Sequence, residues 1–141
     1  MRDRKLATTA IIAAAALIAL GTVMFAADTG VSVAALPAVV VATTPRAGDL
    51  AVDPGLTEIR VTFSKDMADK SWSWVRIGAE SFPEMSGDPR YLSDKRTCVL
   101  PVRLKPGRVY AIYLNRDAHA NFRDAAGQSA MPYLLTFETR H

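Results

Sequence analysis

Apolar and polar residues alternate along several short stretches of this chain, and Pro/Gly turns separate these stretches. The clearest alternation runs over residues 57–64, where Ile59, Val61 and Phe63 share one side of an extended chain. Side chains of a strand point alternately to its two faces, so this pattern predicts a half-buried strand. Further strands are predicted at 38–43, 71–78, 96–104, 108–115 and 133–139, with short ones around Phe82 and at 91–92.

This series of strands predicts a β-sandwich. Beyond the first 27 residues no segment has a helical period and no internal repeat is present. About seven short strands separated by turns are typical of two packed antiparallel sheets. We expect Phe63, Tyr110 and Phe137 to lie in the core between the sheets.

The N-terminal segment has a different composition. Arg2, Arg4 and Lys5 are followed by residues 6–27, which carry no charge. A basic start and an apolar run are typical of an export signal. The run is also long enough to cross a bilayer, which takes about 20 apolar residues. Cleavage after Ala27 or Ala35 and an uncleaved membrane anchor both stay open.

These observations divide the chain into three parts: a signal peptide or N-terminal membrane anchor at 1–27, a flexible tether at 28–37, and one sandwich domain at 38–141. The protein is predicted to be exported, to the periplasm, the cell surface or the medium. Contact with a membrane is expected only through residues 6–27, if they are not removed.

The charge of the chain gives no sign of a nucleic-acid partner. The formal net charge is +3, but without residues 1–27 the chain has 14 basic and 13 acidic residues. Charges of both signs are interspersed without a block of one sign, which is typical of a solvated surface.

Cys98 is the only cysteine, so the chain has no internal disulfide. It shares one strand face with Leu100, Val102 and Leu104, which predicts a small buried hydrophobe. An intermolecular disulfide and a reactive thiol are the alternatives.

The segment from Leu104 to Tyr110 contains the most specific local pattern. A Pro-Gly turn leads into a strand whose third residue is Tyr110. This resembles the tyrosine corner of immunoglobulin-like sandwiches, in which the tyrosine hydroxyl bonds back to the main chain across the turn. We therefore predict a structural role for Tyr110, not a catalytic one.

Five pieces of sequence follow one another in a recognisable order. They are Thr44-Pro45-x-x-Gly48, Ile59-Arg-Val-Thr-Phe63-Ser64-x-x-Met67, Pro106-Gly107-x-x-Tyr110, Arg123-Asp124-Ala-Ala-Gly127, and the last strand from Tyr133 to Thr139. Together they resemble a bacterial Ig-like domain of the S-layer (SbsA-type) class, over residues 38–139.

The resemblance implies an all-β fold: a single Ig-like antiparallel β-sandwich of about seven strands in a Greek key, after an N-terminal signal or anchor helix. It also implies a secreted or surface-attached spacer, adhesion or carbohydrate-proximal module without a cofactor. The expected partner is an envelope protein or a polysaccharide.

The start of the domain is also similar to small periplasmic copper carriers of the CopC type, and this is the alternative function. In that case His119, Asp117 and Asp124 are the candidate metal ligands, since a copper or zinc site needs several converging ligands. Asp117 and Asp124 could also bind calcium or act as acid and base. Arg116 and Arg123 lie in the same loop and are expected to pair with them.

A structural reading of Asp124 competes with these chemical ones. Its carboxylate can cap the turn Asp124-Ala-Ala-Gly127, in which Gly127 supplies a positive φ. The residue types are those that such a turn requires, so no ligand is needed to explain them.

Trp72 and Trp74 are the best candidates for a ligand-binding surface. They are two residues apart and would share a face in a strand. We expect at least one of them in the core, and an exposed ring would suit a sugar or a peptide.

No serine-nucleophile arrangement, phosphate-binding glycine loop or Cys/His cluster is present in the sequence. We therefore predict an exported, non-enzymatic module that acts in binding, adhesion or structural spacing at the bacterial cell envelope. The alternative remains a small periplasmic copper carrier.

Overall fold

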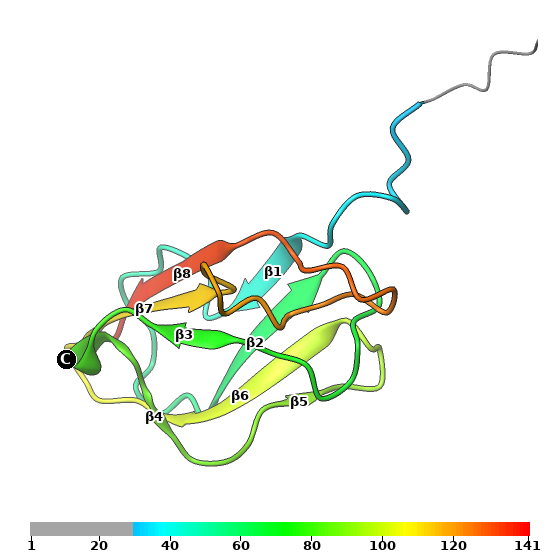
Figure 1. Cartoon of the computed structure of the whole chain (residues 1–141). Helices are drawn as coiled ribbons and strands as arrows, with labels where there is room; N and C mark the ends of the chain where they lie inside the picture. Colours follow the sequence, from blue (N-terminus) through cyan, green and yellow to red (C-terminus); the bar gives the residue numbers. More distant parts are fainter. Residues whose placement is uncertain (1–29) are drawn as a thin grey trace, which may run out of the picture. The chain divides into compact units, whose positions relative to one another are not determined.

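The computed structural model describes residues 30–141, and in them the chain forms eight strands and one short 3-10 helix (Figure 1). The elements are β1 (Val40–Thr44), β2 (Glu58–Phe63), β3 (Trp74–Arg76), η1 (Ala79–Ser81), β4 (Glu84–Met85), β5 (Arg90–Tyr91), β6 (Thr97–Arg103), β7 (Val109–Leu114) and β8 (Tyr133–Glu138).

The strands form two sheets. One has the order β1-β2-β6-β4, with β5 also paired to β6, and the other has the order β3-β7-β8. All pairs of named strands are antiparallel. This order matches the A-B-E-D and C-F-G sheets of an Ig-like sandwich when β4 and β5 together take the place of strand D. The predicted fold class is confirmed.

Strand D is divided because Pro101 lies in the middle of β6. Beside β6, β5 pairs with Val99 and Cys98, and β4 pairs with Val102 and Arg103. Pro101 lies between the two pairings and has no N–H to donate to a neighbouring strand. The Ser86 N–H still donates to the Pro101 carbonyl at 3.0 Å, and the chain then leaves β6 over residues 87–89, of which Asp88 and Pro89 form part of one wall of the hollow described below.

Two predicted strands differ from the observed ones. The strand predicted at 71–78 is shorter, because β3 covers only Trp74–Arg76. The short strand predicted around Phe82 lies two residues further on, at Glu84–Met85, and the 3-10 helix η1 precedes Phe82. Side-chain contacts explain both differences: Ser73 Oγ accepts the Asn121 N–H at 3.0 Å before β3, and Ser81 Oγ accepts the Gly78 N–H at 3.1 Å after it.

The free edge of β8 is covered by residues 48–52, which run parallel to it. Four backbone hydrogen bonds join the two segments: Gly48 N–H to Thr136 O, Glu138 N–H to Asp49 O, Val52 N–H to Glu138 O, and Arg140 N–H to Val52 O, at 2.8–3.0 Å. On the other side of the sandwich, the outer edges of β3, β4 and β5 pair with no further strand within residues 30–141. The two sheets are therefore open along that side.

The core lies between the sheets and confirms the alternation predicted for β2. Phe63, Tyr110 and Phe137 are buried, as expected. Met67 and Phe122 are also buried, which their sequence context does not predict because polar residues flank both. The Phe122 ring packs on Phe63, with ring centroids 5.1 Å apart, and so joins the β7–β8 loop to the core.

The tyrosine corner is present. The Tyr110 hydroxyl accepts a hydrogen bond from the Lys105 N–H at 2.9 Å, across the turn between β6 and β7. Gly107 in that turn has φ +62°, a conformation that favours glycine. The Tyr110 ring packs on Phe137, with centroids 5.2 Å apart. The residue is structural, as predicted.

The segment before β1 is fixed to the sandwich by the Lys65 side chain and by hydrogen bonds at Ala38 and Val39. Lys65 Nζ donates to the carbonyls of Ala34 and Leu36 at 2.9 and 2.8 Å, and to Asp124 Oδ2 at 3.0 Å. The predicted signal or anchor at 1–27 lies outside the described residues. Within residues 30–141, no helix has the length and apolar character to span a membrane.

Candidate functional site

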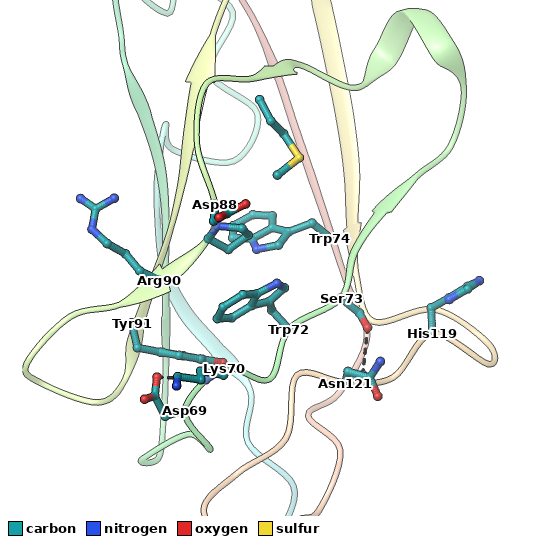
Figure 2. A pocket seen from close by; sticks show the side chains of 12 residues that line it. Asp69, Lys70, Trp72, Ser73, Trp74, Asp88, Arg90, Tyr91, His119 and Asn121 are labelled. Carbon is teal, nitrogen blue, oxygen red and sulfur yellow. Dashed lines mark hydrogen bonds between the residues drawn. The ribbon is translucent and has the colours of Figure 1, made fainter.

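Both tryptophans line one open hollow of about 880 Å³ (Figure 2). The hollow lies at the open side of the sandwich, between the edge strand β3 and the segment that includes β5. Its other walls come from the loop before Trp72 and from the loop between β7 and β8, at His119 and Asn121. We call this site the tryptophan hollow. It brings together three segments that are far apart in sequence: residues 69–74, 85–91 and 119–121.

Each indole is half-buried and supported by a second aromatic ring. The Trp72 ring lies against Tyr91, with centroids 6.3 Å apart. Trp74 meets Phe122 edge to face, with centroids 5.5 Å apart, and contacts both core clusters. Neither ring is fully buried. Trp74 thus serves the core and the hollow at once, while Trp72 precedes β3 instead of lying within it.

The thiol behind Trp74 is chemically inert. Cys98 is fully buried, as predicted, and burial raises the pKa of its thiol to about 12 although the Trp74 indole favours the thiolate. The Trp74 Nε1–H is buried and makes no regular hydrogen bond, since the neighbouring Cys98 sulfur is a weak acceptor. A neutral thiol at this depth is not a nucleophile.

Polar groups surround the rings. The Tyr91 hydroxyl donates to the Ser71 carbonyl at 2.9 Å, and burial raises the pKa of Tyr91 above its ordinary value, so the hydroxyl stays neutral. Ser73 Oγ accepts the Asn121 N–H at 3.0 Å (Figure 2). Asp69 Oδ1 accepts the Lys70 N–H at 2.9 Å. These bonds fix the loops that carry the rim of the hollow.

Asn115 organises the β7–β8 loop from inside. Its side chain is buried, donates to the carbonyls of Phe122 and Ala130 at 3.0 Å each, and accepts the Phe122 N–H at 2.9 Å. Phe122 is thereby held under Trp74. No local pattern points to Asn115, because its partners are seven and fifteen residues away.

The three candidate metal ligands do not converge. His119 is exposed at the rim of the hollow, and Asp117 is 85% exposed with Oδ2 3.4 Å from Arg116 Nε. The Asp124 carboxylate is 2% exposed and is bonded to Lys65, not to Arg123 as expected. Within residues 30–141 there is no group of three or more His, Cys, Asp or Glu side chains placed to hold a metal ion.

Asp124 has the structural role that was predicted for it. Its Oδ1 accepts the N–H groups of Ala126 and Gln128 at 3.0 and 2.9 Å, and Gly127 has φ +86°. Burial tends to raise the pKa of Asp124, but the hydrogen bonds from Lys65 and the two amides outweigh it and hold the pKa below its ordinary value. The carboxylate is an ionised cap of its own turn.

The bacterial Ig-like domain family matches residues 34–139, which is most of the chain. The chain belongs to this family. The family prediction is thus confirmed, and the matched residues include all eight strands described above. A comparison with curated proteins gives no match.

Several solved structures are similar to this Ig-like domain. Domains 1–6 of the surface layer protein SbsC are 21% identical, with 76% of this chain and 14% of that chain covered and a TM-score of 0.49. The N-terminal part of the bacterial S-layer protein SbsC gives the same identity, coverage of this chain and TM-score, with 24% of that chain covered. The chain thus spans less than a quarter of these proteins, and they are SbsC, whereas the sequence resemblance was to the SbsA type.

Proposed function

We propose that this Ig-like protein is exported and acts as a non-enzymatic binding module at the bacterial cell envelope, with the tryptophan hollow as its binding surface. The observation that carries the proposal is the hollow itself. Concave sites with aromatic walls and a few polar groups are where proteins bind ligands, and their volumes are about 300–1,000 Å³. The hollow has this size and composition.

The non-enzymatic part of the proposal rests on the state of the reactive groups. Neither His119 nor His141 makes a side-chain hydrogen bond among residues 30–141, so no histidine there activates a hydroxyl. Cys98 is buried with a raised pKa, and the Asp124 carboxylate is occupied by Lys65. A nucleophile held by a base and an orienting group, which covalent catalysis requires, has no candidate there.

Export is supported by the basic start and the uncharged residues 6–27. The test is fractionation of producing cells into soluble and membrane fractions, with N-terminal sequencing and intact mass of the recovered protein. A species outside the cytoplasm that begins near Asp28 or Leu36, or a membrane-bound one that retains Arg2, supports the proposal. Uncleaved protein in the cytoplasmic fraction contradicts it.

Binding is tested by sedimentation with insoluble cell-envelope material. The wild-type protein should sediment with the material, and Trp72→Ala should stay in the supernatant. Tyr113→Ala is the matched control, because Tyr113 is an aromatic residue of β7 that does not line the hollow. Equal sedimentation of the three proteins would refute the hollow as the binding surface.

A further inference from the structure

The aromatic surface of the hollow is rigid. Trp72 and Trp74 each rest on a second ring, and the Tyr91 ring behind Trp72 is fixed by its hydrogen bond to the Ser71 carbonyl. The Phe122 ring behind Trp74 is fixed by the bonds of Asn115. Preorganised aromatic rings lose little conformational entropy when a ligand binds, so they are suited to flat contact with it.

The polar side chains at the rim are free to bond a ligand. Lys70, Asp88, His119 and Asn121 make no side-chain hydrogen bond or ion pair among residues 30–141. Figure 2 shows Asp88 beside Trp74, and Asn121 near Ser73 at the other side of the rings. Donors and acceptors therefore flank the indoles on both sides. A ligand with an apolar face and polar groups around its edge matches this arrangement.

The charges of the hollow do not suit a polyanionic ligand. Arg90 is directed away from the rings in Figure 2 and is paired with Glu58 at 2.6 Å. The remaining charged side chains of the hollow are one cation, Lys70, and two carboxylates, Asp69 and Asp88. A polyanion such as nucleic acid needs a cluster of unpaired cations, which the hollow lacks.

A quaternary ammonium group and a lipid tail also fit poorly. An ammonium group is bound by rings that enclose it, but Trp72 and Tyr91 lie against each other, 6.3 Å apart, instead of facing each other across a gap. A lipid tail requires apolar walls throughout, whereas the rim here carries Asp69, Asp88 and Asn121. An uncharged ligand rich in hydroxyl groups matches the aromatic rings and the polar side chains beside them best.

We propose that the tryptophan hollow binds a neutral glycan chain, with the apolar face of a sugar ring on Trp72 and the sugar hydroxyls bonded by Asp88 and Asn121. Carboxylate and amide groups accept hydrogen bonds from hydroxyls, and the Asn121 amide also donates one. Because the hollow is open at the side of the sandwich, a chain can pass along it instead of ending in it. This inference rests on the proposed function and names the ligand class of the same site.

The experiment uses the purified protein in the form recovered from cells. Its sedimentation is measured with untreated envelope material and with the same material after protease digestion. Soluble polysaccharide released from that material is separated by anion exchange into a neutral and an acidic fraction, and each fraction is tested as a competitor. Quenching of tryptophan fluorescence by the neutral fraction gives the affinity directly.

We expect protease digestion to leave binding unchanged, and the neutral fraction to compete while the acidic one does not. Trp72→Ala should weaken the affinity for the neutral fraction at least tenfold, as removal of a central aromatic contact does at other binding sites. Asp88→Ala should weaken it several-fold without loss of stability, because Asp88 is exposed and unpaired. Tyr113→Ala should bind like the wild type.

Three results would overturn the inference. If protease digestion abolishes binding and the neutral fraction does not compete, the partner is a protein, and the proposed binding function would stand. Competition by the acidic fraction alone would identify an anionic polymer, with the same consequence. If no preparation retains the wild type more than Trp72→Ala, both the inference and the proposed binding surface are wrong.

Discussion

Replacing Asn115 by alanine removes three hydrogen bonds from a buried site. The side chain bonds two carbonyls at 3.0 Å and one N–H at 2.9 Å. Each bond contributes about 1 kcal/mol to the free energy of unfolding, so their loss should cost about 3 kcal/mol. Asn115 also has φ +60°, and alanine in the left-handed region costs about 1 kcal/mol more. We expect a total loss of about 4 kcal/mol, a large part of the roughly 5–15 kcal/mol typical of a domain.

Urea unfolding followed by tryptophan fluorescence measures this loss. Asn121→Ala is the matched control, because Asn121 lies in the same loop but is exposed and its side chain has no partner. Its effect should stay within about 0.5 kcal/mol. Asn115→Asp should destabilise at neutral pH at least as much as Asn115→Ala, since it places a charge beside two carbonyl oxygens. A loss below about 1 kcal/mol for Asn115→Ala would refute the assigned role.

Four further outcomes follow from the described contacts. Tyr110→Phe should lower the free energy of unfolding by about 1–2 kcal/mol, because the Lys105 N–H loses its acceptor while the ring stays; urea unfolding tests this, and an unchanged midpoint contradicts it. Cys98 should resist a thiol-specific disulfide reagent until the chain is unfolded, because burial raises its pKa to about 12; rapid labelling of the folded protein would show the thiol to be accessible. The folded-state pKa of Asp124 lies below its ordinary value of 3.8, so the stability it contributes is present above about pH 4 and is lost as the pH falls through the folded pKa. Asp124→Asn should therefore flatten the acid part of the stability curve, and equal slopes in the two proteins would be inconsistent with this role. Lys65→Met should make the segment before β1 more sensitive to limited proteolysis, because two of its carbonyls lose their donor, whereas an unchanged cleavage pattern would mean that the segment is held by other contacts.

The sequence predicts the fold well where one strand face is buried and the other is exposed. β2 and β7 have this character. Buried residues alternate with more exposed ones in both strands: Ile59, Val61 and Phe63 in β2, and Tyr110 and Ile112 in β7. The tyrosine corner is also predictable, since its hydroxyl reaches an amide only five residues away. Local patterns are sufficient for such elements.

The sequence predicts less of the β3 region and of the loops. Ser71 Oγ donates to the Asn121 carbonyl and Ser73 Oγ accepts the Asn121 N–H, so these side chains tie the start of the predicted strand to the β7–β8 loop. Phe122 stands alone among polar residues, and only the distant Asn115 explains why it turns inward. Asp124 pairs with Lys65, 59 residues away, instead of a neighbouring arginine. Contacts over such separations have no period for a pattern to show.

The candidate site was predictable only in part. Trp72 and Trp74 stood out by residue type and spacing alone. The sequence does not mark out Asp88, Tyr91 and Asn121 in the same way. They lie outside the segment that carries the tryptophans, and only the fold brings them to the rings. Pro101 is the one sequence feature related to this part of the site. It divides strand D, and the chain near Asp88 can therefore form a wall of the hollow.

The parallel pairing of residues 48–52 with β8 has a mechanical consequence. The chain enters the sandwich at Ala38, which belongs to one core cluster, and leaves it beyond Phe137, which belongs to the other. These two points lie at opposite ends of the sandwich (Figure 1). A pull on the two ends of the domain therefore acts along the strands. Because the paired segments run in the same direction, their four hydrogen bonds would bear the force together in shear instead of opening one after another. The contact between residues 48–52 and β8 is therefore the part of the domain suited to resist such stretching.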